Sequence, residues 1–173
     1  MMPYSVDEYM LFLEGELTML LPNGDGIKIK AGDAFIVPKG FECQWQQNSS
    51  VRKFFMILDG NAPKSKNASL KQITVPNLAK PDNVALNTSR RDFLNNSGDM
   101  SVDVQAHGPV IQMGRTSEAN ELITVLHGSL QLYDGEVQHV FSKGDTAYLH
   151  KGDMVDWKTD LATHLIVASY DRN

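Results

Sequence analysis

The sequence predicts an all-β protein made of two small barrels in tandem. The segment from Asp7 to Trp45 matches the segment from Asn120 to Trp157 in the spacing of its special residues, so the chain carries an internal repeat. Within each copy, short apolar runs are separated by turn residues, as in antiparallel sheets. The absence of a long segment with the 3.6-residue period of a helix favours a sandwich or barrel.

Each copy reads as short strands joined by tight turns. The string NGDG at 23–26 predicts a hairpin because Asn, Asp and Gly tolerate positive φ angles. Asp134 and Gly135 have the same function in the second copy. A Lys-Gly pair at 39–40, and again at 151–152, marks another turn before the strand that carries the tryptophan.

The repeat divides the chain into three parts. We expect an N-terminal half at 1–60, a linker at 61–98 that is rich in Asn, Ser, Lys and Pro, and a C-terminal half at 99–173. The segment 73–78 is expected either to form one strand or to pack across a barrel surface, since a long connection without structure is uncommon. The segment that begins at 99 supplies opening strands to the second barrel. The first copy has no such strands, so we expect either that another segment or a second chain completes its barrel, or that the sequence begins inside an ancestral domain. We also expect a homodimer.

Composition and charge exclude several classes of protein. Apolar residues make up 42% of the 173 residues and charged residues 21%, which is enough to bury a core. The net charge of -5, without a basic stripe, argues against a nucleic-acid partner. No window reaches the roughly 18 apolar residues of a membrane span. The single cysteine, Cys43, excludes an intramolecular disulfide, and the first residues lack the pattern of a secretory signal, so a cytoplasmic location is expected.

The motifs of both copies resemble the cupin superfamily, whose motifs are G-x5-H-x-H-x3,4-E-x6-G and G-x5-P-x-G-x2-H-x3-N. Glu8 with Gly15, and Glu121 with Gly128, have the E-x6-G spacing, and GDAFIVPKG at 32–40 fits the start of the second motif. The first copy is similar to the branch with cupin domains of the ureidoglycine aminohydrolase and ethanolamine-utilisation kind. The resemblance implies two double-stranded β-helix, or jelly-roll, barrels in tandem (a bicupin), the first without its opening strands.

The resemblance also implies a divalent metal held by two histidines of H-x-H, one glutamate and a third histidine. The positions aligned with these histidines carry other residues: Met2, Tyr4 and Cys43 in the first copy, and Arg115, Ser117 and Val155 in the second. Neither half can therefore build the usual metal site. No cofactor is predicted.

Glu8 and Glu121 occupy a position that the resemblance places inside the barrel. A carboxylate there must be paired, hydrated or protonated, so it serves either a ligand or acid/base chemistry, or a structural contact. A weakly held divalent metal would need an unusual set of ligands, such as Glu8 with Cys43, or Glu121 with His164 and water. Cys43 is otherwise a small core residue.

Further side chains are candidates for ligand contact. Tyr4, Trp45 and Trp157 form either an aromatic wall or ordinary core. Lys53 either binds an anionic group or is a solvated surface charge. Arg115 is expected opposite the glutamate of its own barrel, in a structural ion pair or as half of an anion site. The candidate ligand-binding residues are Tyr4, Glu8, Cys43, Trp45, Lys53, Arg115, Ser117, Glu121, Trp157 and His164.

We expect a bicupin that binds or senses a small molecule without the usual metal. The resemblance implies a polar metabolite such as an organic acid, an amino-acid derivative or a ureido compound. The alternative is an enzyme that acts on a C–N bond or isomerises a small organic acid, with Glu8 or Glu121 as the acid/base and Tyr4, Lys53 or Arg115 holding the substrate. A third possibility is a structural or assembly role, in which strand edges pair between subunits.

Overall fold

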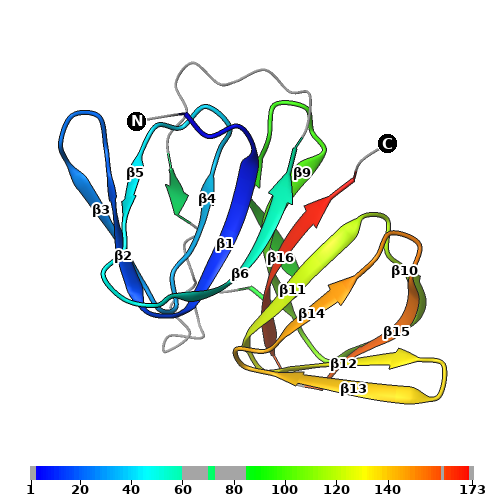
Figure 1. Ribbon diagram of the computed structural model, residues 1–173. Coiled ribbons are helices and arrows are strands. Elements are labelled where there is room, and N and C mark those ends of the chain that lie inside the picture. The colour runs from blue at the N-terminus through cyan, green and yellow to red at the C-terminus, as the bar shows by residue number, and fades with distance from the viewer. Residues whose placement is uncertain (1–2, 60–69, 73–84, 161, 172–173) are drawn as a thin grey trace. The chain divides into compact units, whose positions relative to one another are not determined.

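The expected all-β tandem fold is confirmed. The computed structural model describes residues 3–59, 70–72, 85–160 and 162–171, and every regular element in these ranges is a strand (Figure 1). No helix in the described ranges is long and apolar enough to cross a membrane. The chain divides into an N-terminal unit, Met1–Thr74 with Asn95–Gly98, and a C-terminal unit, Val75–Leu94 with Asp99–Asn173. The segment 73–78, for which a strand or packing across a barrel surface is expected, lies outside the described residues.

The described residues of the N-terminal unit form seven strands in two antiparallel sheets. They are β1 (Asp7–Glu14), β2 (Glu16–Leu20), β3 (Gly26–Lys30), β4 (Ala34–Val37), β5 (Gln44–Gln46), β6 (Arg52–Leu58) and β7 (Lys71–Gln72). One sheet has the order β6-β1-β4-β7 and the other the order β3-β2-β5. The apolar alternation of the sequence therefore corresponds to antiparallel strands with one face toward a core.

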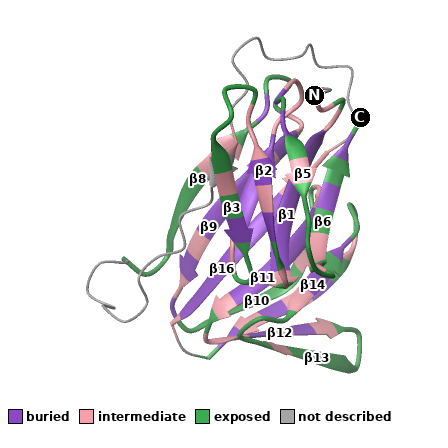
Figure 2. Ribbon diagram, turned by 60° about the vertical axis from the view of Figure 1, so that its left-hand side comes forward, coloured by how far each residue is buried: buried purple, intermediate pink, exposed green. Residues whose placement is uncertain are grey.

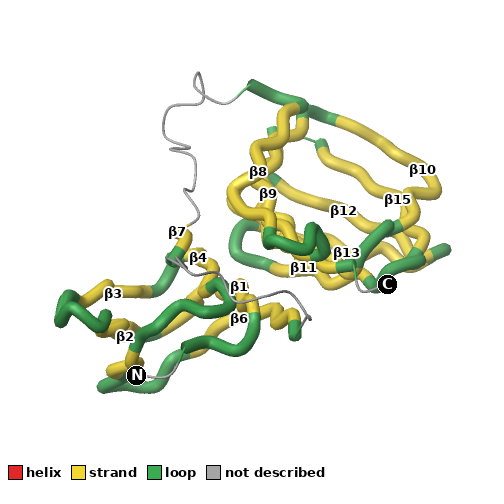
Figure 3. Tube along the Cα trace, turned by 90° about the horizontal axis from the view of Figure 1, so that it is seen from above, coloured by secondary structure: helices red, strands yellow, loops and turns green. Residues whose placement is uncertain are grey.

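The described residues of the C-terminal unit form nine strands, again in two antiparallel sheets. They are β8 (Thr88–Leu94), β9 (Met100–His107), β10 (Val110–Thr116), β11 (Asn120–His127), β12 (Ser129–Asp134), β13 (Val137–Ser142), β14 (Thr146–Leu149), β15 (Met154–Thr159) and β16 (Thr163–Tyr170). The sheets have the orders β14-β11-β16-β9-β8 and β10-β15-β12-β13, and from above the strands close around a common centre (Figure 3). Strand β8 lies within 61–98, the range that the sequence predicts as a linker.

The internal repeat relates β1–β6 to β11–β16. The turn after β3 donates the N–H of Gly32 to the carbonyl of Phe12 at 2.8 Å, and the turn after β13 donates the N–H of Gly144 to the carbonyl of Val125 at the same distance. The strand registers agree as well, so each position of the first copy has a defined counterpart in the second.

The N-terminal barrel lacks opening strands among the described residues, as expected. Strand β16 pairs with β9 and β9 with β8, whereas its counterpart β6 is the last strand of its sheet in the part of the chain that the structure describes. One isolated bridge between Pro3 and Glu42 stands where β10 pairs with β15 in the second copy. Phe55 and Ile57 on β6 are 55% and 45% exposed. The first barrel is therefore open along β6.

Each barrel has its own apolar core. Strands β1 and β16 are buried over most of their length, whereas β10 and β13 are mostly exposed (Figure 2). The N-terminal core consists of Met10, Phe12, Leu17, Met19, Ile29, Phe35, Val37, Phe41 and Cys43. The C-terminal core consists of Ile123, Val125, Leu130, Leu132, Ala147, Leu149, Val155, Trp157, Leu165 and Val167.

A glycine between the first two strands of each repeat lets two chain segments approach closely. Gly15 and Gly128 have φ angles of 81° and 77°. A Cβ on Gly15 would lie 2.4 Å from the carbonyl oxygen of Ser50, and one on Gly128 would lie 2.6 Å from that of Ala162. Both the backbone conformation and the space at these turns therefore require glycine.

We expect Gly15→Ala and Gly128→Ala each to lower the free energy of unfolding by more than about 2 kcal/mol, because the clash adds to the cost of a left-handed backbone. Urea denaturation measures this loss. Gly144→Ala is the matched control, since Gly144 has a φ of 91° but a Cβ added there would meet nothing within 4 Å. Equal losses in all three variants would contradict the role of close approach.

Candidate functional site

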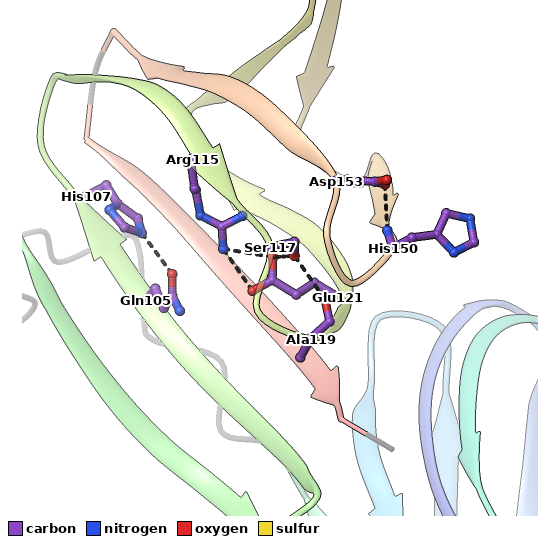
Figure 4. A network of polar contacts seen from close by, with 8 residues as sticks. All are labelled: Gln105, His107, Arg115, Ser117, Ala119, Glu121, His150 and Asp153. Carbon is purple, nitrogen blue, oxygen red and sulfur yellow. Dashed lines mark hydrogen bonds and ion pairs between the residues drawn. The ribbon is translucent and has the colours of Figure 1, made fainter. Parts of the chain in front are cut away.

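The interior of the C-terminal barrel holds a buried carboxylate. Glu121, on β11, is 9% exposed. The Nη2 atom of Arg115, on β10, donates to both carboxylate oxygens at 2.8 Å, and the Ser117 hydroxyl donates to Oε2 at 2.9 Å (Figure 4). Of the two arrangements left open for Arg115, the ion pair is present. The charge of Glu121 is thus balanced inside the barrel.

The Arg115 guanidinium contacts an aromatic ring and has a buried nitrogen that Glu121 does not use. Its Cζ lies 5.0 Å from the centroid of the Trp157 ring, so the cation rests against an aromatic face. Its Nη1 is buried and has no hydrogen-bond partner among the described residues. A buried donor without a partner is costly, so a bound acceptor at this position would be favoured.

Two polar residues of β9, Gln105 and His107, extend the cluster. His107 Nε2 lies 3.0 Å from Gln105 Oε1, and the imidazole centroid lies 5.8 Å from that of Trp157 (Figure 4). Burial, followed by the charges of Arg115 and His164, lowers the pKa of His107 and favours the neutral ring. Because the Gln105 oxygen only accepts, Nε2 carries the proton and Nδ1 remains an acceptor.

Sequence reasoning missed Gln105 and His107. They alternate with Val104 and Ala106, and a polar residue at every second position is the usual pattern of a strand with one solvated face. Strand β9, however, lies between β16 and β8 in the sheet of the closed barrel. The one available signal was the run of polar residues on alternate positions of β9, which includes the buried Asp103.

The N-terminal barrel also neutralises its carboxylate with an internal cation. Glu8, on β1, is 8% exposed, and Lys53 Nζ donates to its Oε1 at 2.8 Å. The same ammonium contacts Met10 Sδ at 3.0 Å and lies 4.8 Å from the Trp45 ring centroid and 5.4 Å from that of Phe55. Lys53 is therefore an internal partner of Glu8 and is not a solvated surface charge.

Tyr4 and Cys43 belong to the same barrel. Cys43 is 7% exposed and lies in the apolar core, where burial raises the pKa of its thiol. Burial also raises the pKa of the Tyr4 hydroxyl, and the charges of Glu8 and Cys43 add to the effect. Both groups are thus held in their neutral forms. The predicted site residues of the first copy, including Trp45, gather in one barrel.

His164 stands outside the hydrogen-bond network of Arg115 and Glu121. Its ring meets that of His127 nearly edge-on, with centroids 5.8 Å apart. Both ring nitrogens are buried without a hydrogen-bond partner among the described residues, and burial, followed by the charge of His127, lowers the pKa of His164. No hydrogen bond links it to the cluster in the described part of the chain.

The two barrels share one arrangement, a buried glutamate with a cation that lies over a tryptophan. The cation comes from β6 in the first barrel and from β10 in the second. A positive group at the carboxylate disfavours a metal ion there, and the described residues include no group of three or more His, Cys, Asp or Glu side chains that could hold one. The residues described therefore do not fit the metal that the cupin resemblance implies.

Comparison with known families agrees with this architecture. Residues 1–55 and 101–164 match the family described as the EutQ-like cupin domain. The chain belongs to the EutQ-like cupin family. No match was found among curated proteins. The two matched segments of this EutQ-like cupin include the glutamate, the cation and the tryptophan of both barrels.

Solved structures show the same tandem fold. A protein of unknown function from Pseudomonas syringae pv. tomato str. DC3000 has a TM-score of 0.78 at 14% identity, over 96% of this EutQ-like cupin and 74% of its own chain. A cupin 2 conserved barrel domain protein from Leptotrichia buccalis has a TM-score of 0.70 at 12% identity, over 99% and 76%. Protein Ylba from E. coli has a TM-score of 0.62 at 11% identity, over 99% and 70%. At such identities the likeness extends to the fold alone.

We expect Lys53→Met to lower the free energy of unfolding by roughly 1–3 kcal/mol, because it leaves the Glu8 carboxylate buried without its charged donor. Adding Glu8→Gln should restore part of the loss, so that the two changes are not additive. Urea denaturation of both single variants and the double variant measures the coupling. The exposed pair of Arg52 and Glu14 is the control and should show almost no coupling. Additive effects of the Lys53 and Glu8 changes would contradict the structural role of the pair.

Proposed function

We propose that this EutQ-like cupin binds a small polar metabolite inside its C-terminal barrel, and that the binding needs no metal ion. The observation that carries the proposal is the buried Nη1 of Arg115, a charged donor without a partner among the described residues. It belongs to a cluster with the Trp157 ring and the polar side chains of Gln105 and His107. Such a combination of an apolar wall with a few polar groups is typical of ligand sites.

The N-terminal barrel is the weaker candidate for binding. The Lys53 ammonium already contacts the Glu8 carboxylate, the Met10 sulfur and two aromatic faces. The neighbouring Cys43 is part of the apolar core. This barrel therefore offers fewer groups to a ligand, and we assign it a structural role.

The cluster favours a ligand with an oxygen acceptor. Arg115 Nη1 supplies a donor and His107 Nδ1 an acceptor, while the charges of Arg115 and Glu121 balance each other. Organic acids, amino-acid derivatives and ureido compounds all carry a carbonyl or carboxylate oxygen that Nη1 could bind. An enzyme that uses Glu121 as its acid/base is less well supported, because both carboxylate oxygens already accept hydrogen bonds.

We expect one or more compounds from a panel of small organic acids, amino-acid derivatives and ureido compounds to raise the thermal unfolding midpoint of the protein. Arg115→Lys keeps a cation near Glu121 but removes the second guanidinium nitrogen. It should weaken binding of that compound by about tenfold or more, as expected for the loss of a charge-assisted hydrogen bond. Differential scanning fluorimetry and isothermal calorimetry measure both effects.

Arg52→Lys is the matched control, because Arg52 forms an exposed ion pair with Glu14. Elemental analysis of the same unchelated sample should find far less than one equivalent of Mn, Fe, Co, Ni, Cu or Zn per chain. A panel without any stabilising compound, binding that survives Arg115→Lys, or close to one metal per chain would each contradict the proposal.

An assembly role is the second candidate. Strand β6 is the last strand of its sheet among the described residues, and its Phe55 and Ile57 side chains are 55% and 45% exposed. An exposed strand edge with apolar side chains is a template for pairing with another chain. We infer a homodimer formed along β6.

We expect light scattering to give twice the mass of one chain, and Ile57→Lys to shift the protein toward the monomer, because the new charge would be buried at the interface. The matched control is Ile111→Lys, on β10, where the side chain is 65% exposed. A monomer at all concentrations, or a dimer that tolerates Ile57→Lys, would contradict pairing along β6.

A further inference from the structure

A cavity of about 340 Å³ lies in the C-terminal unit, and none of the polar residues of the Arg115 cluster lines it. Its floor consists of core side chains from β12 to β15, including Ala147, and its rim carries Asp134, His139 and Asp153. Leu149 and Val155, the strand partners of Glu121 and Arg115, also line it. The size and the apolar floor are those of a small-molecule site.

The repeat explains why this cavity exists. Ala147 pairs with Ile123 as Phe35 pairs with Met10, so Ala147 is the counterpart of Phe35. Phe35 is fully buried in the N-terminal core. Where the first barrel places a phenyl ring, the second therefore has a methyl group, and space is left in an otherwise packed core.

Residues at the rim of the cavity are polar where their counterparts in the first barrel are apolar. The shared register and turn hydrogen bonds make Asp153 the counterpart of Phe41, and His139 the counterpart of Ile27. Both Phe41 and Ile27 pack with the N-terminal core. The change to Ala147 is thus accompanied by polar groups at the edge of the space, whereas a mere packing defect would keep an apolar rim.

The negative charges at the rim indicate the charge of the ligand that the cavity would bind. Asp153 is held in place by the backbone N–H of His150, which donates to its Oδ2 at 2.7 Å. Asp134 is the second carboxylate, and no lysine or arginine is among the described residues that line the cavity. An apolar floor beneath two carboxylates suits a positively charged head on an apolar body.

We propose that this cavity is a second binding site, which takes a small organic amine with an apolar body. The amine would form an ion pair with Asp153 at the rim, and the apolar body would lie over Ala147. This site is independent of the one proposed around Arg115, since it uses other side chains and the opposite ligand charge.

Three probes with one apolar body and different heads test the site: 4-phenylbutylamine, 4-phenylbutan-1-ol and 4-phenylbutyrate. We expect the amine to bind about tenfold or more tightly than the alcohol, and the acid more weakly still, because the amine gains a charge-assisted contact. Calorimetry measures the affinities. Methyl-labelled NMR should show shifts at Ala147 and Leu149 as the amine is added.

Asp153→Asn should lower the preference for the amine over the alcohol, because only the Asp134 carboxylate remains, while it keeps an acceptor for the His150 N–H. Ala147→Phe should remove binding of both the amine and the alcohol. If that variant does not fold, Ala147→Val is the smaller change, and it should weaken binding of both compounds. Glu118→Gln, which removes one exposed surface charge, is the matched control and should change nothing. Equal affinity for amine and alcohol, methyl shifts elsewhere, binding retained in a folded Ala147→Phe variant, or undiminished binding in the Ala147→Val variant would overturn the proposal. Arg115→Lys should leave amine binding intact, so failure of one site is distinguishable from failure of the other.

Discussion

In each barrel, a buried glutamate on the first strand of the repeat is neutralised by an internal cation. Glu8 and Glu121 lie at the same position of equivalent strands, and an uncompensated charge there would cost several kcal/mol. In the first barrel the Lys53 ammonium balances this charge, and in the second the Arg115 guanidinium balances it. In each case the cation lies over the tryptophan that ends the repeat, so the charge pair and the aromatic core of the barrel are parts of one arrangement.

The choice of cation makes the two barrels different. An ammonium is a compact point charge, and the Lys53 Nζ is surrounded by Glu8, Met10 and two rings. A guanidinium has a planar fork of donors, and Arg115 uses only Nη2 for Glu121. The spare Nη1 is why a ligand is proposed for the second barrel and a structural role for the first.

The two barrels also differ in the side chains that fill their cores. The first barrel fills its interior with Phe35 and Phe41, whose counterparts in the second barrel are Ala147 and Asp153. The C-terminal unit, whose sheets include β8, β9 and β10, has a cavity at these positions. The open N-terminal barrel lacks those strands among the described residues, and Phe35 and Phe41 fill its interior.

The sequence by itself determined the all-β fold, the tandem repeat, the missing opening strands and the loss of the metal-binding histidines, because turn glycines, alternation and motif spacing are local features of the chain. It also named ten candidate residues, most of which gather in the two barrels. It did not reveal Gln105, His107 or the cavity at Ala147, and it left open whether Lys53 and Arg115 are paired. Only the tertiary structure decided these points, because they depend on which strands, far apart in the chain, become neighbours and on which side of each strand is enclosed. A strand that is polar on alternate positions looks the same in sequence whether that face meets water or the inside of a barrel.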